Sequence, residues 1–374
     1  MISLEQYRAR FDEEPGYLDF ASRAPVGATV RDEDQAMMVL LGNSRFGTLA
    51  TLDEQDARVR ESVSSLIGMP ADQICFQPNA SQGLMHVMFG LTGEVALSLA
   101  EFPSSTFAAT RAADSLHALT PRWLSTDLGR VTPGNLRDQL TDSITAVAVS
   151  LVDFRTGYLL DLEGIRDVIG DRLLIVDAVQ GLGVVEAPWE VADVIVAGGH
   201  KWLRAGFGTG FLALSERAIG SLVPVLSGWS ATDADGTPVD AVPAPARGAL
   251  AFSISSPDPV AQARLAVALE DLKQVGVAVV NEAVSGRVQQ VIDLADEFHV
   301  PVTSSRPVAE RAGLVTLHPE HHQLTPLVAA LHNHGVTATM RDGTVRLSPH
   351  ATTTDETIGM LRESLVELAA ATIH

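Results

Sequence analysis

The amino-acid sequence predicts an α/β protein in which a large domain is built on a mostly parallel sheet and a smaller α+β domain follows it. Short apolar runs without polar alternation, such as Leu173–Val176 and Val194–Ala197, are typical of strands buried on both faces of a parallel sheet. Helical segments alternate with such runs up to about Leu214, and after residue 251 the order becomes helix, strand, helix, strand, helix. The 374 residues suffice for two domains, which we expect at 16–250 and at 251–374 together with 1–15.

The strand ends between Leu173 and Leu214 are the strongest indication of a functional site. The first apolar run ends on Asp177, and the second ends on a Gly-Gly-His-Lys sequence whose lysine is Lys201. Ligands of open parallel sheets bind beyond the carboxyl ends of the strands, where both side chains would lie. The connection to Phe211–Leu214 is too short for a crossover helix, so we expect this strand to be antiparallel to its neighbour.

An acid and a lysine at neighbouring strand ends fit the requirements of pyridoxal phosphate. This cofactor needs an amine for its Schiff base and a carboxylate that keeps its ring nitrogen protonated, so that the ring accepts electrons from the substrate's Cα. The chain contains only two lysines, Lys201 and Lys273, beside twenty-four arginines, and arginine cannot form a stable Schiff base. A solvated turn lysine and a helix-capping aspartate are the alternatives, and their joint position at strand ends favours the cofactor.

Two motifs in this stretch resemble those of the class V aminotransferase family. Asp-Ala-Val-Gln at 177–180 is followed by Gly-Gly-His-Lys-Trp at 198–202 and by a Gly-Thr-Gly-Phe turn. The family is a branch of the fold-type I pyridoxal-phosphate enzymes that includes cysteine desulfurases, kynureninases and isopenicillin N epimerase-like proteins. The resemblance covers most of the chain and implies a large domain with a seven-stranded sheet and a small α+β C-terminal domain.

The resemblance also implies roles for four residues of the two motifs. Lys201 would be the Schiff-base lysine and Asp177 the partner of the pyridine nitrogen. Gln180 would donate to the phenolic oxygen of the cofactor, and His200 would lie beside the phosphate. Desulfurases often carry a serine where this chain has Gly198, so one phosphate hydrogen bond is either missing or supplied elsewhere.

The segment from Cys75 to Gln82 leads into an apolar-periodic helix that Asn79 or Ser81 can cap. Free N–H groups at a helix start, with a hydroxyl nearby, form an anion site. Since the family places the cofactor phosphate here, we expect Ala80 and Ser81 to bind it. A capped helix without a ligand is the alternative.

Three further segments resemble parts of the family's active site. In the Glu-Phe-Pro-Ser sequence at 101–104, Phe102 would stack on the pyridine ring, and a core phenylalanine is the alternative. Gly16–Gly27 resembles the segment with which the chain enters the active site. Relatives carry an asparagine near Asp153-Phe154-Arg155, so whether these residues contact cofactor or substrate stays open.

Arg346 lies in a Val-Arg-Leu-Ser-Pro-His sequence that resembles the family's RISPH signature. The resemblance implies that its planar guanidinium grips the substrate α-carboxylate, whereas a strand arginine paired with Asp or Glu is the alternative. Trp229 would lie on the substrate side, or fill a surface cleft. Ser255 and Ser256 would reach the phosphate of the other subunit, which requires a homodimer with shared active sites.

Composition excludes several classes of partner. A formal net charge of −20 argues against nucleic acid and anionic membranes. No apolar run is long enough to span a membrane, and the first residues lack the apolar core of a signal peptide, so we expect a cytoplasmic protein. The single cysteine, Cys75, excludes an intramolecular disulfide, and His318, His321 and His322 fit a solvated loop better than a metal site.

The sequence therefore predicts an enzyme that uses pyridoxal phosphate and acts at Cα of an α-amino acid. Cysteine desulfurases that form a persulfide need a mobile cysteine in the small domain, but Cys75 belongs to the large domain. A lyase that eliminates the substrate's side chain is therefore favoured, with a class V aminotransferase or an amino-acid epimerase as alternatives. A non-catalytic binding module with the same fold is the alternative of another class, and the presence of Lys201, Asp177, Gln180 and Arg346 together argues against it.

Overall fold

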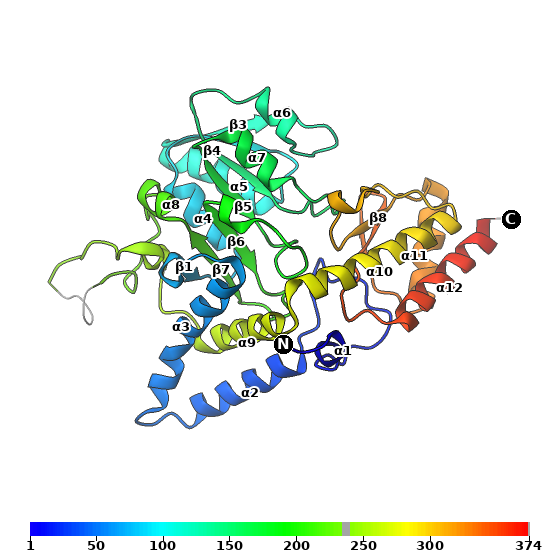
Figure 1. Cartoon of the computed structure of the whole chain (residues 1–374), viewed down its shortest axis with the longest axis horizontal. Coiled ribbons are helices and arrows are strands. Elements are labelled where there is room, and N and C mark those ends of the chain that lie inside the picture. The colour runs from blue at the N-terminus through cyan, green and yellow to red at the C-terminus, as the bar shows by residue number, and fades with distance from the viewer. Residues whose placement is uncertain (234–239, 373–374) are drawn as a thin grey trace.

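The computed structural model describes residues 1–233 and 240–372. Its two sheets lie in two parts of the molecule, a larger part on the left of Figure 1 and a smaller part on the right. Helix α10 (Val277–Glu297) runs from the larger part along the smaller one. The arrangement agrees with the predicted α/β architecture, whereas the exact domain boundaries stay a prediction.

The large sheet has seven strands in the order β1-β7-β6-β5-β4-β2-β3. Only β7 is antiparallel to its neighbours, β1 and β6, so the predicted antiparallel return after Lys201 is confirmed. All other neighbouring strands pair in parallel. The strands are β1 (Ile74–Phe76), β2 (Gly93–Ser98), β3 (Leu119–Leu124), β4 (Ile144–Ser150), β5 (Leu173–Asp177), β6 (Val194–Gly198) and β7 (Gly210–Leu214).

Successive side chains of the central strands enter two different cores, one on each face of the sheet. In β6, Val194 and Val196 belong to the core beneath α4 and α5, whereas Ile195 and Ala197 belong to the opposite core. Because both faces are covered, these strands are apolar throughout, as the sequence predicts. The first core includes α4 (Ala80–Gly90), α5 (Pro103–Leu116) and α8 (Glu216–Ser221); the second includes α3 (Thr48–Ile67) and α7 (Leu162–Ile169).

Three helices form an extension below the large sheet in Figure 1. Helix α9 (Pro259–Val275) packs against both α2 (Ala28–Gly42) and α3. Asp258 caps α9 by accepting from the Val260 N–H (2.9 Å), and Pro259 occupies the first helical position, where its missing N–H costs nothing. The remaining short helices are α1 (Leu4–Arg8), α6 (Pro133–Arg137) and the 3₁₀ turns Ala71–Gln73, Trp189–Val191, Gly248–Phe252 and Val308–Glu310.

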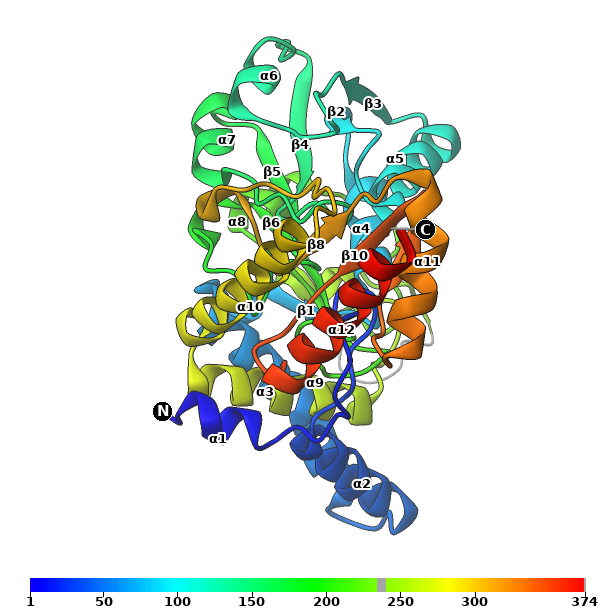
Figure 2. The same ribbon diagram turned by 90° about the vertical axis from the view of Figure 1, so that its right-hand side faces the viewer.

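The small sheet is antiparallel, with the order β8-β10-β9. Figure 2 shows α10, α11 and α12 beside it. The N-terminal segment crosses to this part, because Tyr17 pairs with Thr337 and Asp19 with Ser348. These elements are β8 (Val315–Leu317), β9 (Thr339–Arg341), β10 (Thr344–Leu347), α11 (His321–Asn333) and α12 (Asp355–Thr372).

Strand β3 is absent from the sequence prediction. Its sequence, Leu-Thr-Pro-Arg-Trp-Leu, has neither an apolar run nor alternation, because it lies at the edge of the sheet and pairs only with β2. An edge position also explains how Pro121 is tolerated. Among the described helices, none combines the length and the hydropathy needed to cross a membrane.

Candidate active site

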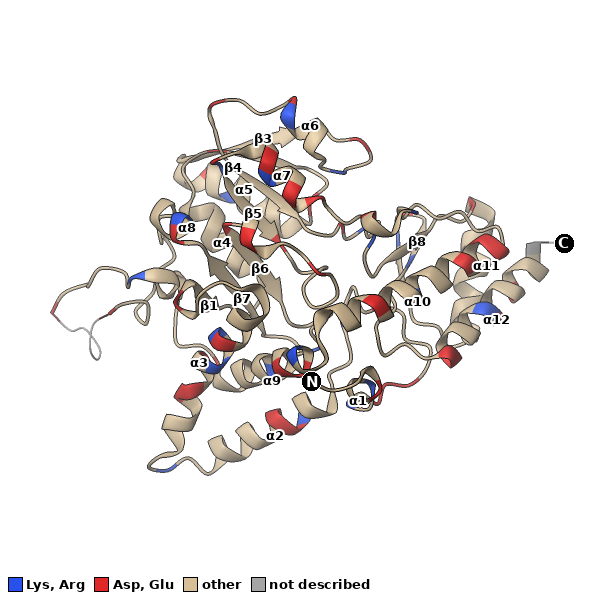
Figure 3. Cartoon of the chain, viewed as in Figure 1, with Lys and Arg blue, Asp and Glu red and all other residues tan. Residues whose placement is uncertain are grey.

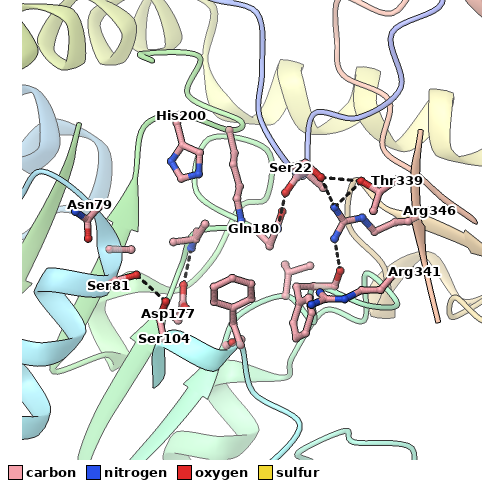
Figure 4. A pocket seen from close by; sticks show the side chains of 18 of the residues that line it. Ser22, Asn79, Ser81, Ser104, Asp177, Gln180, His200, Thr339, Arg341 and Arg346 are labelled. Atoms are coloured by element: carbon pink, nitrogen blue, oxygen red, sulfur yellow. Dashed lines mark hydrogen bonds between the residues drawn. The ribbon is translucent and has the colours of Figure 1, made fainter. Parts of the chain in front are cut away.

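A cavity of about 550 Å³ lies at the carboxyl ends of β4, β5 and β6 and reaches the small sheet. Figure 4 shows Ser81, Ser104, Asp177 and His200 on one side of it, and Ser22, Thr339, Arg341 and Arg346 on the other. Its walls therefore come from the large sheet, the N-terminal segment and the small sheet. The lining residues are Ala21, Ser22, Asn79, Ala80, Ser81, Phe102, Ser104, Ser150, Val152, Phe154, Asp177, Val179, Gln180, His200, Lys201, Thr339, Met340, Arg341 and Arg346.

Asp177 and Lys201 both line this cavity, at the ends of adjacent strands. Asp177 is 7% exposed and Lys201 is 8% exposed. Burial raises the pKa of Asp177, although the Val179 N–H, which donates to its Oδ1 at 3.0 Å, and Lys201 oppose this shift. Burial lowers the pKa of Lys201 to about 8, partly offset by Asp177. The lysine therefore has a neutral, nucleophilic amine in an accessible pH range.

The turn that carries Lys201 tolerates no side chain at Gly199. A Cβ there would lie 2.3 Å from Thr209 Oγ1 and 3.0 Å from the Ala205 Cβ. The Gly199 N–H donates to the Thr209 carbonyl (2.8 Å), and the Ala205 N–H donates to the Gly199 carbonyl (2.8 Å). The glycine thus allows the backbone to close tightly and holds Lys201 at the strand end.

The start of α4 offers the donors of a candidate anion site on one wall of the cavity. Asn79 caps the helix, as its Oδ1 accepts from the Gln82 N–H at 2.9 Å, and the first amides of a helix have no intrahelical partner. The Oγ atoms of Ser81 and Ser104 are 2.6 Å apart, so two hydroxyls accompany these amides. A Cβ at Gly198 would be 3.8 Å from the Ala80 nitrogen, so the strand end carrying Lys201 lies beside this helix start.

His200 lies next to this anion site. Its ring stacks on Phe207, with centroids 5.1 Å apart and 18° between planes. Burial, and to a smaller extent Lys201, lowers the pKa of His200 to about 4. The imidazole is therefore neutral at physiological pH and offers a hydrogen bond rather than a charge.

Two phenylalanines line the cavity with rings that are nearly perpendicular to each other. The Phe102 and Phe154 rings meet edge to face, with centroids 5.1 Å apart. The Lys201 Nζ lies 5.3 Å from the centre of the Phe102 ring. A planar ligand attached to this lysine would therefore find an aromatic face within reach.

The Gln180 amide is held in one orientation by two hydrogen bonds. The indole N–H of Trp202 donates to Gln180 Oε1 at 2.7 Å, and Gln180 Nε2 donates to the Ala21 carbonyl at 2.9 Å. Since an indole N–H can only donate, it must face the amide oxygen. Nε2 retains a second hydrogen, so Gln180 can donate to a ligand in the cavity.

Arg346 is buried between the N-terminal segment and the loop after β4. Its Nη1 donates to the Phe154 carbonyl and its Nη2 to Ser22 Oγ, both at 2.7 Å, and Asp19 lies 3.8 Å away. Burial lowers the pKa of Arg346 and Asp19 opposes the shift. Within the described residues, its buried Nε has no hydrogen-bond partner. The arginine is thus held in place while donors remain for a ligand.

An ion pair below the Lys201 turn joins three distant segments. Arg204 is 1% exposed, and its Nη1 and Nη2 donate to the Glu13 carboxylate at 3.0 and 2.6 Å. Its Nη1 also donates to Thr352 Oγ1 (3.0 Å), and Thr352 itself donates to Glu13 (2.5 Å). These contacts fix the turn after Lys201 against the chain start and the segment after Arg346.

Two residues singled out in the sequence lie away from the cavity of a single chain. Trp229 is 59% exposed. Ser256 lines a separate cavity of about 280 Å³, together with Cys75. Neither lines the cavity at Lys201, so their expected roles stay predictions. The described residues contain no group of three or more His, Cys, Asp and Glu side chains able to hold a metal.

Four further residues line the cavity without having been predicted from the sequence: Ser22, Ser104, Thr339 and Arg341. Ser104 belongs to the Glu-Phe-Pro-Ser stretch and Ser22 to the segment Gly16–Gly27, so both lie within segments that resemble the family. Thr339 and Arg341 form β9, a strand too short to give a sequence signal.

The chain is similar to several known proteins. Curated relatives include an uncharacterized aminotransferase, YcbU, of Bacillus subtilis, which is 26% identical over 332 residues, covering 86% of this chain and 85% of that protein. They also include a probable cysteine desulfurase of Methanothermobacter thermautotrophicus, which is 24% identical over 401 residues, covering 94% of this chain and 94% of that protein.

Solved structures show the same fold. A cysteine desulfurase from Thermococcus onnurineus superposes with a TM-score of 0.88 at 19% identity, over 99% of each chain. A cystine C-S lyase complex has a TM-score of 0.84 at 20% identity, over 95% of this chain and 97% of that chain. The predicted fold-type I architecture is thereby confirmed. The model of the family described as aminotransferase class-V matches residues 17–370, and the chain therefore belongs to this family of pyridoxal-phosphate enzymes.

Proposed function

We propose that this protein binds pyridoxal phosphate through Lys201 and acts at Cα of an α-amino acid, with elimination of the side chain as the favoured reaction. The observation that carries the proposal is the joint burial of Lys201 and Asp177 at adjacent strand ends in one cavity. Membership of the family establishes the class of cofactor, whereas the roles of the individual residues and the reaction are proposed.

The donor groups of the cavity fit the three functional parts of the cofactor. The phosphate would be held by the first amides of α4 with Ser81 and Ser104, whose hydroxyls are 2.6 Å apart. Asp177 would receive the pyridine N–H, and Gln180 would donate to the phenolic oxygen. Phe102 would cover the ring. When bound, the cofactor withdraws electrons from Cα of the attached amino acid.

The residues of the chain would then position the substrate and move its proton. Arg346 would bind the α-carboxylate with its free donors and so orient the bonds at Cα. Lys201, with a pKa of about 8, can accept a proton from Cα and return it near neutral pH. Asp177, which is buried at the end of β5, would maintain the positive charge of the pyridine nitrogen.

The position of Cys75 favours elimination over persulfide formation. It is the single cysteine, it is buried in the strand β1, and it does not line the cavity at Lys201. Burial raises the pKa of its thiol to about 12, so it is a poor nucleophile. A protein cysteine that accepts sulfur from a substrate would have to be accessible. Transamination and epimerisation use the same residues and remain the alternatives.

Product analysis of the loaded protein tests the proposal. Incubation with a panel of amino acids should release ammonia and a keto acid without net amination of the cofactor. Transfer of the amino group to the cofactor would establish transamination instead, and exchange with inversion at Cα would establish epimerisation. A protein that binds the cofactor but converts no amino acid would be a non-catalytic module. Lys201→Ala should abolish every conversion while the fold is kept.

A homodimer with shared active sites is part of the proposal. The described tip of α2 and α3 exposes apolar side chains, including Phe46 (107%), Val39 (62%) and Leu49 (62%), which a second copy would cover. Sedimentation equilibrium should give twice the mass of the chain. A monomer would remove the proposed phosphate contact of Ser256.

A cytoplasmic location is also proposed, and cell fractionation tests it.

A further inference from the structure

A second cavity of about 400 Å³ adjoins the one at Lys201. The two share Phe154, Thr339, Arg341 and Arg346 in their walls. The second cavity therefore begins at the arginine that would hold the substrate's α-carboxylate and extends away from Lys201. The second cavity is therefore within reach of the side chain of a substrate whose α-carboxylate is held by Arg346.

The walls of this second cavity carry four arginines: Arg130, Arg155, Arg341 and Arg346. The only carboxylate among its lining residues is that of Asp342, whose side chain is 93% exposed to solvent. The chain as a whole has a formal net charge of −20, and Figure 3 shows acidic residues on helices of both parts. A concentration of positive charge in one cavity of such a protein requires a reason.

Internal ion pairs neutralise these arginines only in part. Arg155 is paired with Asp153 (2.5 Å) and Arg346 has Asp19 at 3.8 Å. Among the residues that the structure describes, the acidic partner of Arg341 is Asp342, at 3.9 Å. Within the described part of the chain, Arg130 forms no ion pair. At least two positive charges are therefore without close compensation.

Arg130 lines the second cavity and packs on an aromatic ring. Its guanidinium lies 4.8 Å above the Tyr158 ring, and its buried Nε has no hydrogen-bond partner among the described residues. The preceding residue, Gly129, packs on Arg155, since a Cβ there would be 2.2 Å from Arg155 Nη2. Arg130 and Arg155 thus both line this cavity, and a bound anion would interact favourably with their charges.

We propose that this cavity binds an anionic group at the end of the substrate's side chain, such as a carboxylate, sulfonate or phosphate. The inference rests on the proposed function, because it requires the α-amino group at Lys201 and the α-carboxylate on Arg346. The favoured substrates are accordingly acidic α-amino acids. Arg130 and Arg341 are the residues that recognise the distal anion, since Arg155 is paired closely with Asp153 and Arg346 would hold the α-carboxylate.

Titration of the visible absorption band of the loaded protein tests this inference. The probes are matched pairs: L-aspartate with L-asparagine, L-glutamate with L-glutamine, and O-phospho-L-serine with L-serine. We expect the acidic member of at least one pair to bind on the order of tenfold more tightly, as for a charge-assisted hydrogen bond. Arg341→Gln and Arg130→Gln should each reduce this ratio severalfold, and together bring it near one.

Arg122→Gln is the matched control. It removes one positive charge from a side chain that is 56% exposed, pairs with Glu94 and lines neither cavity. It should leave the ratio unchanged. Equal affinity for both members of every pair, or a ratio that Arg341→Gln and the double variant keep, overturns the inference while leaving the proposed function intact. If no amino acid changes the band, the proposed function fails and this inference with it.

Discussion

Replacing Arg346 with lysine distinguishes a role of this residue in substrate binding from a role in maintaining the fold. The side chain is 8% exposed, and its guanidinium donates to the Phe154 carbonyl and to Ser22 Oγ, both at 2.7 Å. A lysine keeps the positive charge but has a single nitrogen, so it cannot serve both acceptors and a carboxylate with the same planar geometry. The α-carboxylate would lose its bidentate partner.

The size of the effect follows from these contacts. A buried bidentate contact between arginine and a carboxylate contributes about 2–4 kcal/mol, equivalent to roughly 30- to 1,000-fold in affinity. Loss of one protein hydrogen bond in addition costs about 1–3 kcal/mol of folding stability. We expect the affinity for α-amino acids to fall by roughly 30- to 1,000-fold. The thermal midpoint of unfolding should fall by several degrees.

The assay compares amino acids with their decarboxylated analogues by titrating the absorption band of the loaded protein. Alanine paired with ethylamine, and glutamate paired with 4-aminobutyrate, isolate the α-carboxylate. The substitution should markedly weaken binding of the amino acid in each pair and should change binding of the amine little. Equal weakening of both ligands would refute the reasoning, since Arg346 would then hold the small sheet in place without contacting substrate. Ser22→Ala, which removes one supporting contact of Arg346, should cause a smaller loss of affinity, and this loss should again affect the amino acid more than the amine.

Three further changes test other parts of the site. Asp177→Asn should leave the cofactor covalently attached but lower turnover by orders of magnitude, because a neutral amide no longer stabilises the protonated pyridine; near wild-type turnover would make Asp177 structural. Covalent uptake of pyridoxal phosphate by the cofactor-free protein should accelerate with rising pH and level off above about 8, since the pKa of Lys201 is lowered and only its neutral amine reacts; stopped-flow absorbance showing no inflection near this pH would contradict the burial effect. Glu13→Gln should lower the free energy of unfolding by about 3–5 kcal/mol in urea titrations, because Arg204 would remain buried without its counter-charge; a loss below about 1 kcal/mol would show that the pair is dispensable.

Local patterns were sufficient to predict the central strands and one wall of the site. Val194–Ala197 is apolar throughout because both faces of β6 are covered, and the helix expected after residue 251 is α9, which begins directly after its own cap, Asp258. Lys201 and Asp177 follow adjacent parallel strands, and the parallel arrangement alone brings them to one edge.

The opposite wall depends on contacts between distant segments, which local patterns do not encode. Arg204 and Glu13 are 191 residues apart, and Arg346 and Ser22 are 324 apart. Arg346 lies in a motif that is recognisable in the sequence, whereas only the tertiary arrangement distinguishes Arg204, Glu13 and Ser22. The expected contact of Ser256 concerns a second subunit, which a single chain does not test, and Trp229, expected on the substrate side, does not line the cavity at Lys201.

The site of cofactor attachment is the central claim, and the composition of the chain makes it unusually easy to measure. Protein loaded with pyridoxal phosphate is reduced with sodium borohydride, digested and analysed by mass spectrometry. Because only Lys201 and Lys273 are present, just two internal positions compete. The account predicts loss of the visible band and a reduced pyridoxyl group on the peptide that contains Lys201. A label on Lys273, or no label on either lysine, would contradict it.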